Sequence, residues 1–189
     1  VVLLSKAHKI TGVRVFAADF VSLVLSGVGV ETDLTAVQGV LAQARTAIDL
    51  YAPRETRVEL NERFVTGLAR LLKEAEPGSD HQLAFARALA NAARSDAVVQ
   101  LLQAWLAGNE APAGLAVDTD LRWLILTNLA RLGVVGDDTI DAELARDATA
   151  RGAEQAAGAR AAQPTPAAKA AAWLLATEDD DVPNETHFQ

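Results

Sequence analysis

The stretch that decides the fold is Val117-Asp118-Thr119-Asp120-Leu121-Arg122-Trp123-Leu124-Ile125-Leu126-Thr127-Asn128-Leu129-Ala130-Arg131-Leu132. Asp118 or Thr119 can accept a hydrogen bond from a free first-turn amide, and the carboxylates favour the positive end of the helix dipole. Apolar side chains then recur at spacings of three and four, which marks one helical face interrupted only by Asn128. Gly133 and Gly136 end the run. The stretch therefore predicts the central buried helix of an all-helical domain.

The composition also favours helices over strands. The chain has 189 residues, of which 50% are hydrophobic but only 5% aromatic. Ala and Leu dominate, and they pack helices closely while supplying few of the β-branched runs typical of strands. The length suffices for one domain with its own core, so we expect a single all-α domain over residues 1–189.

Helix-start and helix-stop signals divide the remaining chain. Pro77-Gly78 breaks a helix. Ser79 can cap the next one while Gln82 reaches back to the Ser79 N–H. Tyr51 and Val58 are expected to face inward, and residues 17–28 are apolar nearly all round, which suits a buried helix. The expected helices outside the central one are 17–28, 32–50, 53–74, 79–94, 95–106, 137–162 and 165–177.

The spacing of the helix starts suggests a repeated architecture. The starts near Asp33, Ser79 and Asp118 are 46 and 39 residues apart. HEAT and armadillo units have a similar period of about 40–47 residues. Because the pairs do not repeat in sequence, we predict an irregular right-handed superhelix of antiparallel helix pairs, a HEAT/armadillo-like solenoid.

Charge and hydropathy argue against several classes of partner. The formal net charge is −8, and Lys and Arg are scattered without a basic stripe. We therefore expect no nucleic-acid partner. No apolar stretch approaches the roughly 18 residues that span a bilayer, and no signal peptide is visible, so we expect a cytoplasmic chain without a membrane partner. The absence of cysteine excludes disulfides and thiolate metal sites.

Residues that might carry chemistry are sparse. The three histidines, His8, His81 and His187, are far apart, and none belongs to an HExxH pattern. His81 is expected to be a surface residue of a first helical turn. The acidic run of residues 178–181 lacks the alternating ligands of a calcium loop, which favours a solvated charge run. No metal-binding residue and no cofactor follow from the chain itself.

The central helix carries the conspicuous polar side chains. Asp118 and Asp120 are better explained by capping than by acid–base catalysis. Arg122 is expected to form an ion pair with Asp118 or with a neighbouring helix, and Trp123 to anchor the core. The residues therefore predict no active site within this chain and identify no catalytic or substrate-binding residue.

Four stretches in order resemble a known family. They are ADFVSLVL at 18–25 followed by ETD at 31–33, PGSDHQL at 77–83, VDTDLRW at 117–123, and AQPTPAAK at 162–169 leading to Trp173. Together they resemble the C-terminal helical domain of the zinc metallopeptidase aminopeptidase N, particularly its actinobacterial members, and the similar domain of endoplasmic-reticulum aminopeptidases. The resemblance covers roughly residues 17–184, whereas residues 1–12 match poorly.

The resemblance implies a non-catalytic role. In that family the HExxH zinc site and the GxMEN motif lie in an upstream catalytic domain, and neither is in this sequence. The C-terminal domain forms a bowl that encloses the active-site chamber and controls substrate access. The resemblance thus implies an upstream catalytic domain of the same polypeptide and peptide substrates as partners, and zinc only in the parent enzyme. It also implies that the chain is a fragment that lacks the family's last helices.

Two other classes remain open on the residues alone. A stand-alone interaction scaffold should present one extended concave surface. The ligand-binding domain of a helical transcription regulator should enclose an apolar pocket and normally follows a helix-turn-helix segment, which is not visible here. If the chain is a fragment, its final helix lacks the later helices that would pack on it in the family. The apolar residues of this final helix are Trp173, Leu174 and Leu175. We therefore expect self-association through the C-terminal end, or fraying of the chain beyond Thr177.

Overall fold

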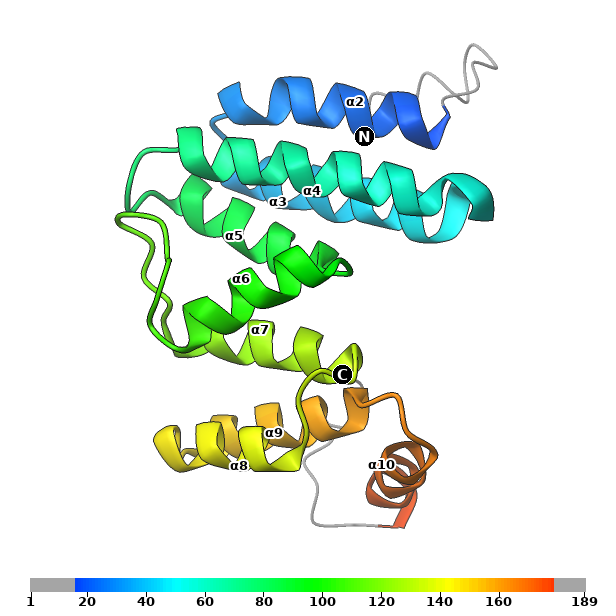
Figure 1. Cartoon of the computed structure of the whole chain (residues 1–189), viewed down its shortest axis with the longest axis vertical. Helices are drawn as coiled ribbons and strands as arrows, with labels where there is room; N and C mark the ends of the chain where they lie inside the picture. Colours follow the sequence, from blue (N-terminus) through cyan, green and yellow to red (C-terminus); the bar gives the residue numbers. More distant parts are fainter. Residues whose placement is uncertain (1–15, 179–189) are drawn as a thin grey trace. The chain divides into compact units, whose positions relative to one another are not determined.

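The computed structural model describes residues 16–178, and this part of the chain contains helices and no strand. The prediction of an all-α fold is confirmed. The helices are α2 (Ala17–Gly27), α3 (Leu34–Thr46), α4 (Arg57–Glu74), α5 (Asp80–Ala92), α6 (Asp96–Leu106), α7 (Thr119–Arg131), α8 (Asp137–Arg146), α9 (Ala150–Ala162) and α10 (Pro166–Glu178) (Figure 1).

The described residues divide into two compact units. The first comprises residues 16–95 and 111–116, and the second comprises residues 96–110 and 117–178. Each unit has its own packed helices. The single domain, the superhelix and its handedness stay predictions.

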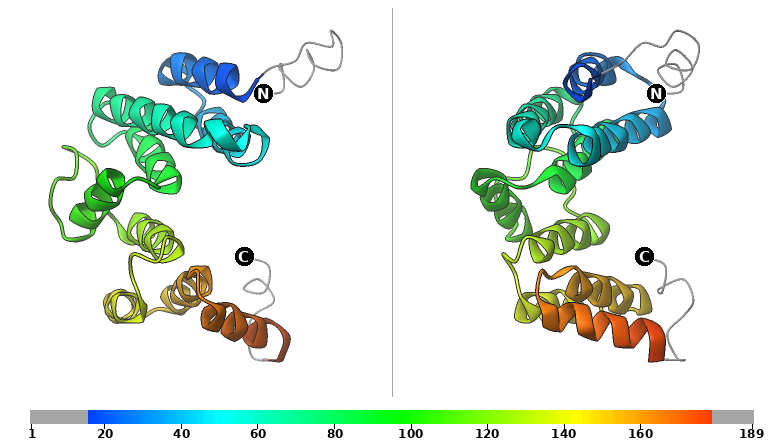
Figure 2. Two further views of the ribbon diagram at one scale, coloured as in Figure 1. Left: turned by 45° about the vertical axis from the view of Figure 1, so that its right-hand side comes forward. Right: turned by 90° about the vertical axis from the view of Figure 1, so that its right-hand side faces the viewer.

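The first unit consists of two helical layers. Helices α2 and α4 form one layer, and α3 and α5 form the other (Figure 2). Helix α4 makes its most extensive contacts with α5, to which it is joined by a short turn. Phe64, Leu68 and Leu89 are among the side chains fully buried between the layers. Burial of such apolar side chains stabilises the unit by roughly 1.5–3 kcal/mol each.

The second unit is built around α7. This helix packs against α6 and α9, while α9 also packs against α8 and α10 (Figure 2). Trp123 and Leu126 of α7 share a buried cluster with Ile140 of α8 and with Ala156 and Ala159 of α9. The alanines let α9 approach α7 closely, because they bring no bulk to the interface.

All three predicted helix starts are observed. The side chain of Asp33 accepts from the backbone N–H groups of Thr35 and Ala36, and that of Asp118 accepts from Leu121. Ser79 accepts from the Gln82 N–H as expected. The Gln82 side chain, however, accepts from the N–H of Gly78 at 2.8 Å instead of from Ser79. The Ser79 N–H is already donated to the Glu76 carbonyl.

The end of α7 is also as expected. Gly133 has a φ of +73°, a left-handed conformation that suits glycine. Its N–H donates to the Ala130 carbonyl, and the N–H of Val134 donates to the Leu129 carbonyl. These two bonds form a Schellman motif, which satisfies carbonyls left free by the end of the helix.

The predicted helix over 137–162 is wrong, because the chain forms two helices there. Helix α8 ends at Arg146, and Asp147 leaves the helical conformation at φ −117° and ψ 68°. The side chain of Thr149 then caps α9 by accepting from the Gly152 N–H. Asp147 is held outside the helix by bonds that its carboxylate accepts from Trp123 and Thr149. Side-chain bonds of this kind compete with helix continuation.

Three expectations of burial are also wrong. Helix α3 ends at Thr46 and is followed by one π-turn over Ala47–Tyr51, which rotates Tyr51 outward to 78% exposure. Val58 lies in the first turn of α4 and is 70% exposed. Helix α2 buries only one face, since Leu23 is 55% exposed. Apolar residues at helix ends and on outer faces need not be covered.

Candidate functional site

Arg122 of α7 and Glu143 of α8 form a bidentate salt bridge inside the second unit. The Arg122 Nε and Nη2 donate to the two carboxylate oxygens of Glu143, each at 2.6 Å. Nη1 donates to the Leu106 carbonyl at 2.8 Å. The side chains are only 14% and 6% exposed. The hydrogen bond with Glu143 raises the pKa of Arg122 above its ordinary value. The expected ion pair to a neighbouring helix is confirmed, but Asp118 is not the partner.

Trp123 anchors the core of the same unit. Its side chain is 1% exposed, and its indole Nε1 donates to Asp147 Oδ2 at 2.8 Å. The prediction of a core anchor is confirmed. The guanidinium donors of Arg122 and the indole N–H of Trp123 all have partners within the unit. This network therefore links α7 to its neighbours in the unit.

The carboxylates at the start of α7 have structural partners. Asp118 caps the helix through the Leu121 N–H at 2.8 Å. Asp120 lies 3.0 Å from the Arg151 guanidinium of α9, on the exposed side. Asp118 therefore caps the helix, as the sequence indicated, whereas Asp120 forms an exposed ion pair that the sequence did not predict.

His81 is less exposed than expected. Its side chain is half-buried at the start of α5, and Nε2 donates to the Glu31 carbonyl at 2.8 Å. The ring also meets Phe85 edge-on, with centroids 6.2 Å apart. His8, His187 and residues 179–181 lie outside the described residues. Between residues 16 and 178, no group of three potential metal ligands comes together.

A solvent-open groove crosses the layer formed by α3 and α5. It has a volume of about 550 Å³ and contains the side chains of Arg45 and Arg87. The Nε of Arg87 is buried and has no hydrogen-bond partner within the described part of the chain. The sequence did not predict this groove, because an arginine in an amphipathic helix is usually an ordinary surface residue.

A second groove lies between α9 and α10. It has a volume of about 980 Å³, and its lining includes alanines of both helices and Leu175. Lys169 of α10 donates to the Ala161 carbonyl at 2.6 Å and helps to hold the two helices together. Trp173 is 71% exposed, so the expectation of an uncovered apolar residue on this helix is met.

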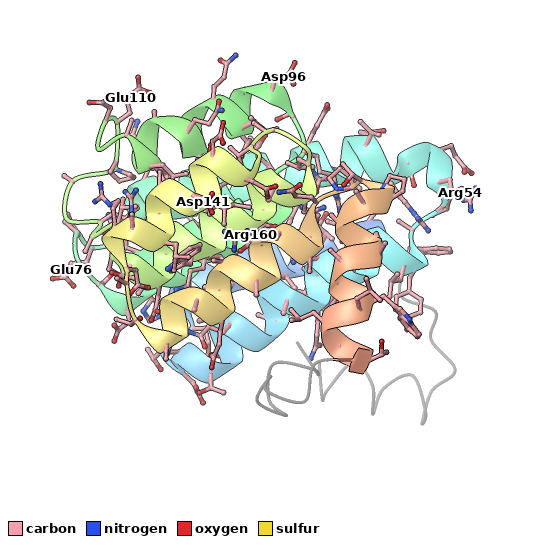
Figure 3. The ribbon with its side chains drawn as sticks, turned by 90° about the horizontal axis from the view of Figure 1, so that it is seen from below. Arg54, Glu76, Asp96, Glu110, Asp141 and Arg160 are labelled. Carbon is pink, nitrogen blue, oxygen red and sulfur yellow. The ribbon has the colours of Figure 1, made fainter. Side chains whose placement is uncertain are left out.

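The ion pair between Asp141 and Arg160 joins α8 to α9 and is exposed at the surface (Figure 3). Because this ion pair is exposed, it should contribute little to the free energy of folding. In residues 16–178, every helix is too short or too polar to traverse a lipid bilayer.

Comparison with known proteins identifies relatives of this sequence. The sequence model of the ERAP1-like C-terminal domain matches residues 10–188. Aminopeptidase N of Streptomyces lividans is 48% identical to this chain over 166 residues. The matched region covers 88% of this chain but only 19% of that protein. The chain thus spans about a fifth of the length of the relative it matches.

Proposed function

Because the chain belongs to the family of ERAP1-like C-terminal domains, we propose that it is the non-catalytic helical domain of a zinc aminopeptidase. In this role it encloses the active-site chamber and limits which peptides reach the catalytic centre. The observation that carries the proposal is the 48% identity to an aminopeptidase N across 88% of the chain.

The geometry supports a role without chemistry of its own. The conspicuous polar residues Arg122 and Glu143 are paired with each other, and Asp118 caps a helix. A catalytic acid or base needs access to a substrate, which the nearly buried side chains of Arg122 and Glu143 lack. The exposed carboxylate of Asp118 already accepts the Leu121 N–H. The partners we propose are therefore the catalytic domain of the parent enzyme and its peptide substrates, with zinc bound in that domain and none in this chain.

A chimaeric enzyme tests the proposal. The matched segment of Streptomyces lividans aminopeptidase N would be replaced by residues 17–178 of this chain, and a second version would lack the segment. Both would be assayed on an aminoacyl arylamide and on peptides of increasing length. We expect the chimaera to retain the parent's length preference and the deletion to lose it.

The arylamide serves as the internal control, because it is too small to contact an enclosing domain. A deletion that leaves the length preference unchanged would refute the proposal. Metal analysis of the 189-residue chain alone provides a second check. We expect no stoichiometric zinc and no aminopeptidase activity that survives repurification.

A further inference from the structure

The groove between α3 and α5, which we call the α3–α5 groove, has an apolar floor and polar walls. Leu41 of α3, Phe64 of α4 and Ala84 of α5 line it and are buried. The small side chains of Ala42 and Ala88 leave the hollow unfilled. Its volume of about 550 Å³ lies within the range of sites that bind small molecules or a few peptide residues.

Among the residues that line the groove, Arg87 of α5 is unusual in its hydrogen bonding. Its Nε is buried, and no acceptor bonds it in the described part of the chain. Several other arginines of the same unit have carboxylate partners, such as Arg70 with Glu74 at 2.7 Å. A buried donor without an acceptor is costly. If the Arg87 side chain turned its Nε toward the groove, a carboxylate bound there would supply the missing acceptor.

The charge around the groove favours an anionic group. Asp49 is the acidic residue among the lining side chains, and its two carboxylate oxygens are shared between Arg45 at 3.5 Å and Arg94 at 2.6 Å. The lining therefore contains two guanidinium groups, those of Arg45 and Arg87, and one carboxylate, which is already paired. The groove is locally positive although the chain carries a net charge of −8.

The π-turn over Ala47–Tyr51 forms one end of the groove. It places Asp49 and Leu50 among the lining residues. π-turns break the regular helix and occur frequently at functional sites. This irregularity is an observation independent of the charge of Arg87, and it points to the same place.

We propose that the α3–α5 groove binds the glutamate side chain of a peptide, with Arg87 as the main hydrogen-bond donor to its carboxylate and Arg45 as a second cation. The two methylene groups of glutamate fit the apolar floor formed by Leu41 and Ala84. The amide side chain of Gln38 on the wall can bond the peptide backbone. The choice of a peptide rests on the proposed function. The groove would select substrates that carry an acidic residue.

The test is a titration of the ¹⁵N-labelled 189-residue chain, followed by NMR. The probes are the blocked peptide acetyl-Ala-Ala-Glu-Ala-Ala-amide, its Gln analogue, and the Gln analogue with a free C-terminal carboxylate. We expect the Glu peptide to bind at least about tenfold more tightly than either Gln peptide, and the Arg87 Nε–H signal to shift on binding.

Variants connect the binding to the groove. Arg87→Gln and Arg45→Gln should each weaken binding of the Glu peptide. Arg87→Lys should recover only part of it, because an ammonium lacks the planar fork of a guanidinium. Arg63→Gln is the matched control, since Arg63 lies on α4 in an exposed pair with Glu59. Thermal melts of all variants would test whether each variant retains the fold.

Three results would overturn the inference. They are equal binding of the Glu and Gln peptides, preference for the free C-terminal carboxylate, and unchanged binding after Arg87→Gln and Arg45→Gln in folded protein. The chimaeric enzyme separates this inference from the proposed function. If the chimaera controls peptide length but the chain shows no preference for glutamate, the inference fails while the proposed function stands.

Discussion

Arg122 and Glu143 hold α7 and α8 together through two parallel hydrogen bonds of 2.6 Å, although they lie 21 residues apart in the sequence. The same guanidinium also donates to the Leu106 carbonyl at the end of α6. One side chain therefore joins three helices of the second unit. Because both partners are nearly buried, removing Glu143 leaves the charge of Arg122 without its carboxylate partner in a desolvated place.

Removal of the Glu143 carboxylate should destabilise the second unit. Glu143→Ala should lower the free energy of unfolding by about 3–5 kcal/mol, the usual cost of an unpaired buried charge. The double variant Arg122→Met with Glu143→Leu should be less destabilised than Glu143→Ala, because no buried charge remains. Arg63→Ala, which breaks an exposed pair, should change stability by less than about 0.5 kcal/mol. Urea melts followed by circular dichroism measure all three.

Trp123 is expected to dominate the stability of the second unit. Trp123→Ala should cost about 3–5 kcal/mol through the cavity that it leaves. Trp123→Phe keeps most of the volume but removes the donor to Asp147, so it should cost less. The order of the two denaturation midpoints is the readout. Equal and small effects would contradict the assignment of Trp123 as the anchor.

Ser79 tests the cap of α5. Ser79→Ala should lower the free energy of unfolding by about 1 kcal/mol, because the Gln82 N–H loses its acceptor. Ser22 provides the comparison: its hydroxyl bonds within α2 at an exposed position. Ser22→Ala should change stability by no more than about 0.5 kcal/mol. Thermal melts that show no difference between the two variants would argue against a stabilising cap.

Gly114 tests a close contact between two turns of the first unit. It has a φ of +82°, and a Cβ at this position would lie 2.5 Å from the Gly78 nitrogen. Gly114→Ala should therefore be destabilising, because backbone atoms cannot move aside easily. Gly39 lies inside α3 with nothing within 4 Å of a Cβ. Gly39→Ala should stabilise the chain by about 0.5–1 kcal/mol. The two melting temperatures should move in opposite directions.

The exposed end of α10 is expected to promote self-association. Trp173 is 71% exposed, and Leu174 and Leu175 lie next to it. An apolar surface of this kind tends to find a partner. Light scattering over a concentration series should show association that Trp173→Gln weakens. Val58→Gln, at an equally exposed site on α4, should leave it unchanged. A monomer at every concentration would contradict the prediction.

The all-α fold and the helix starts at Asp33, Ser79 and Asp118 could be predicted from the sequence. Caps and apolar periodicity act within a few residues, so their signals are local. The burial of Trp123 was predictable for the same reason. The break at Asp147 was not, because its carboxylate is held by Trp123 from a helix 24 residues away in the chain.

The candidate groove also depends partly on local sequence and partly on tertiary packing. The sequence by itself determined that Arg45 and Arg87 lie on helices, since both fall within amphipathic runs. Only the tertiary structure decided that α3 packs beside α5, that small alanines leave a hollow between them, and that Arg87 Nε has no partner there. Pairing between side chains distant in sequence depends on how two helices are rotated and packed. No local pattern encodes that rotation.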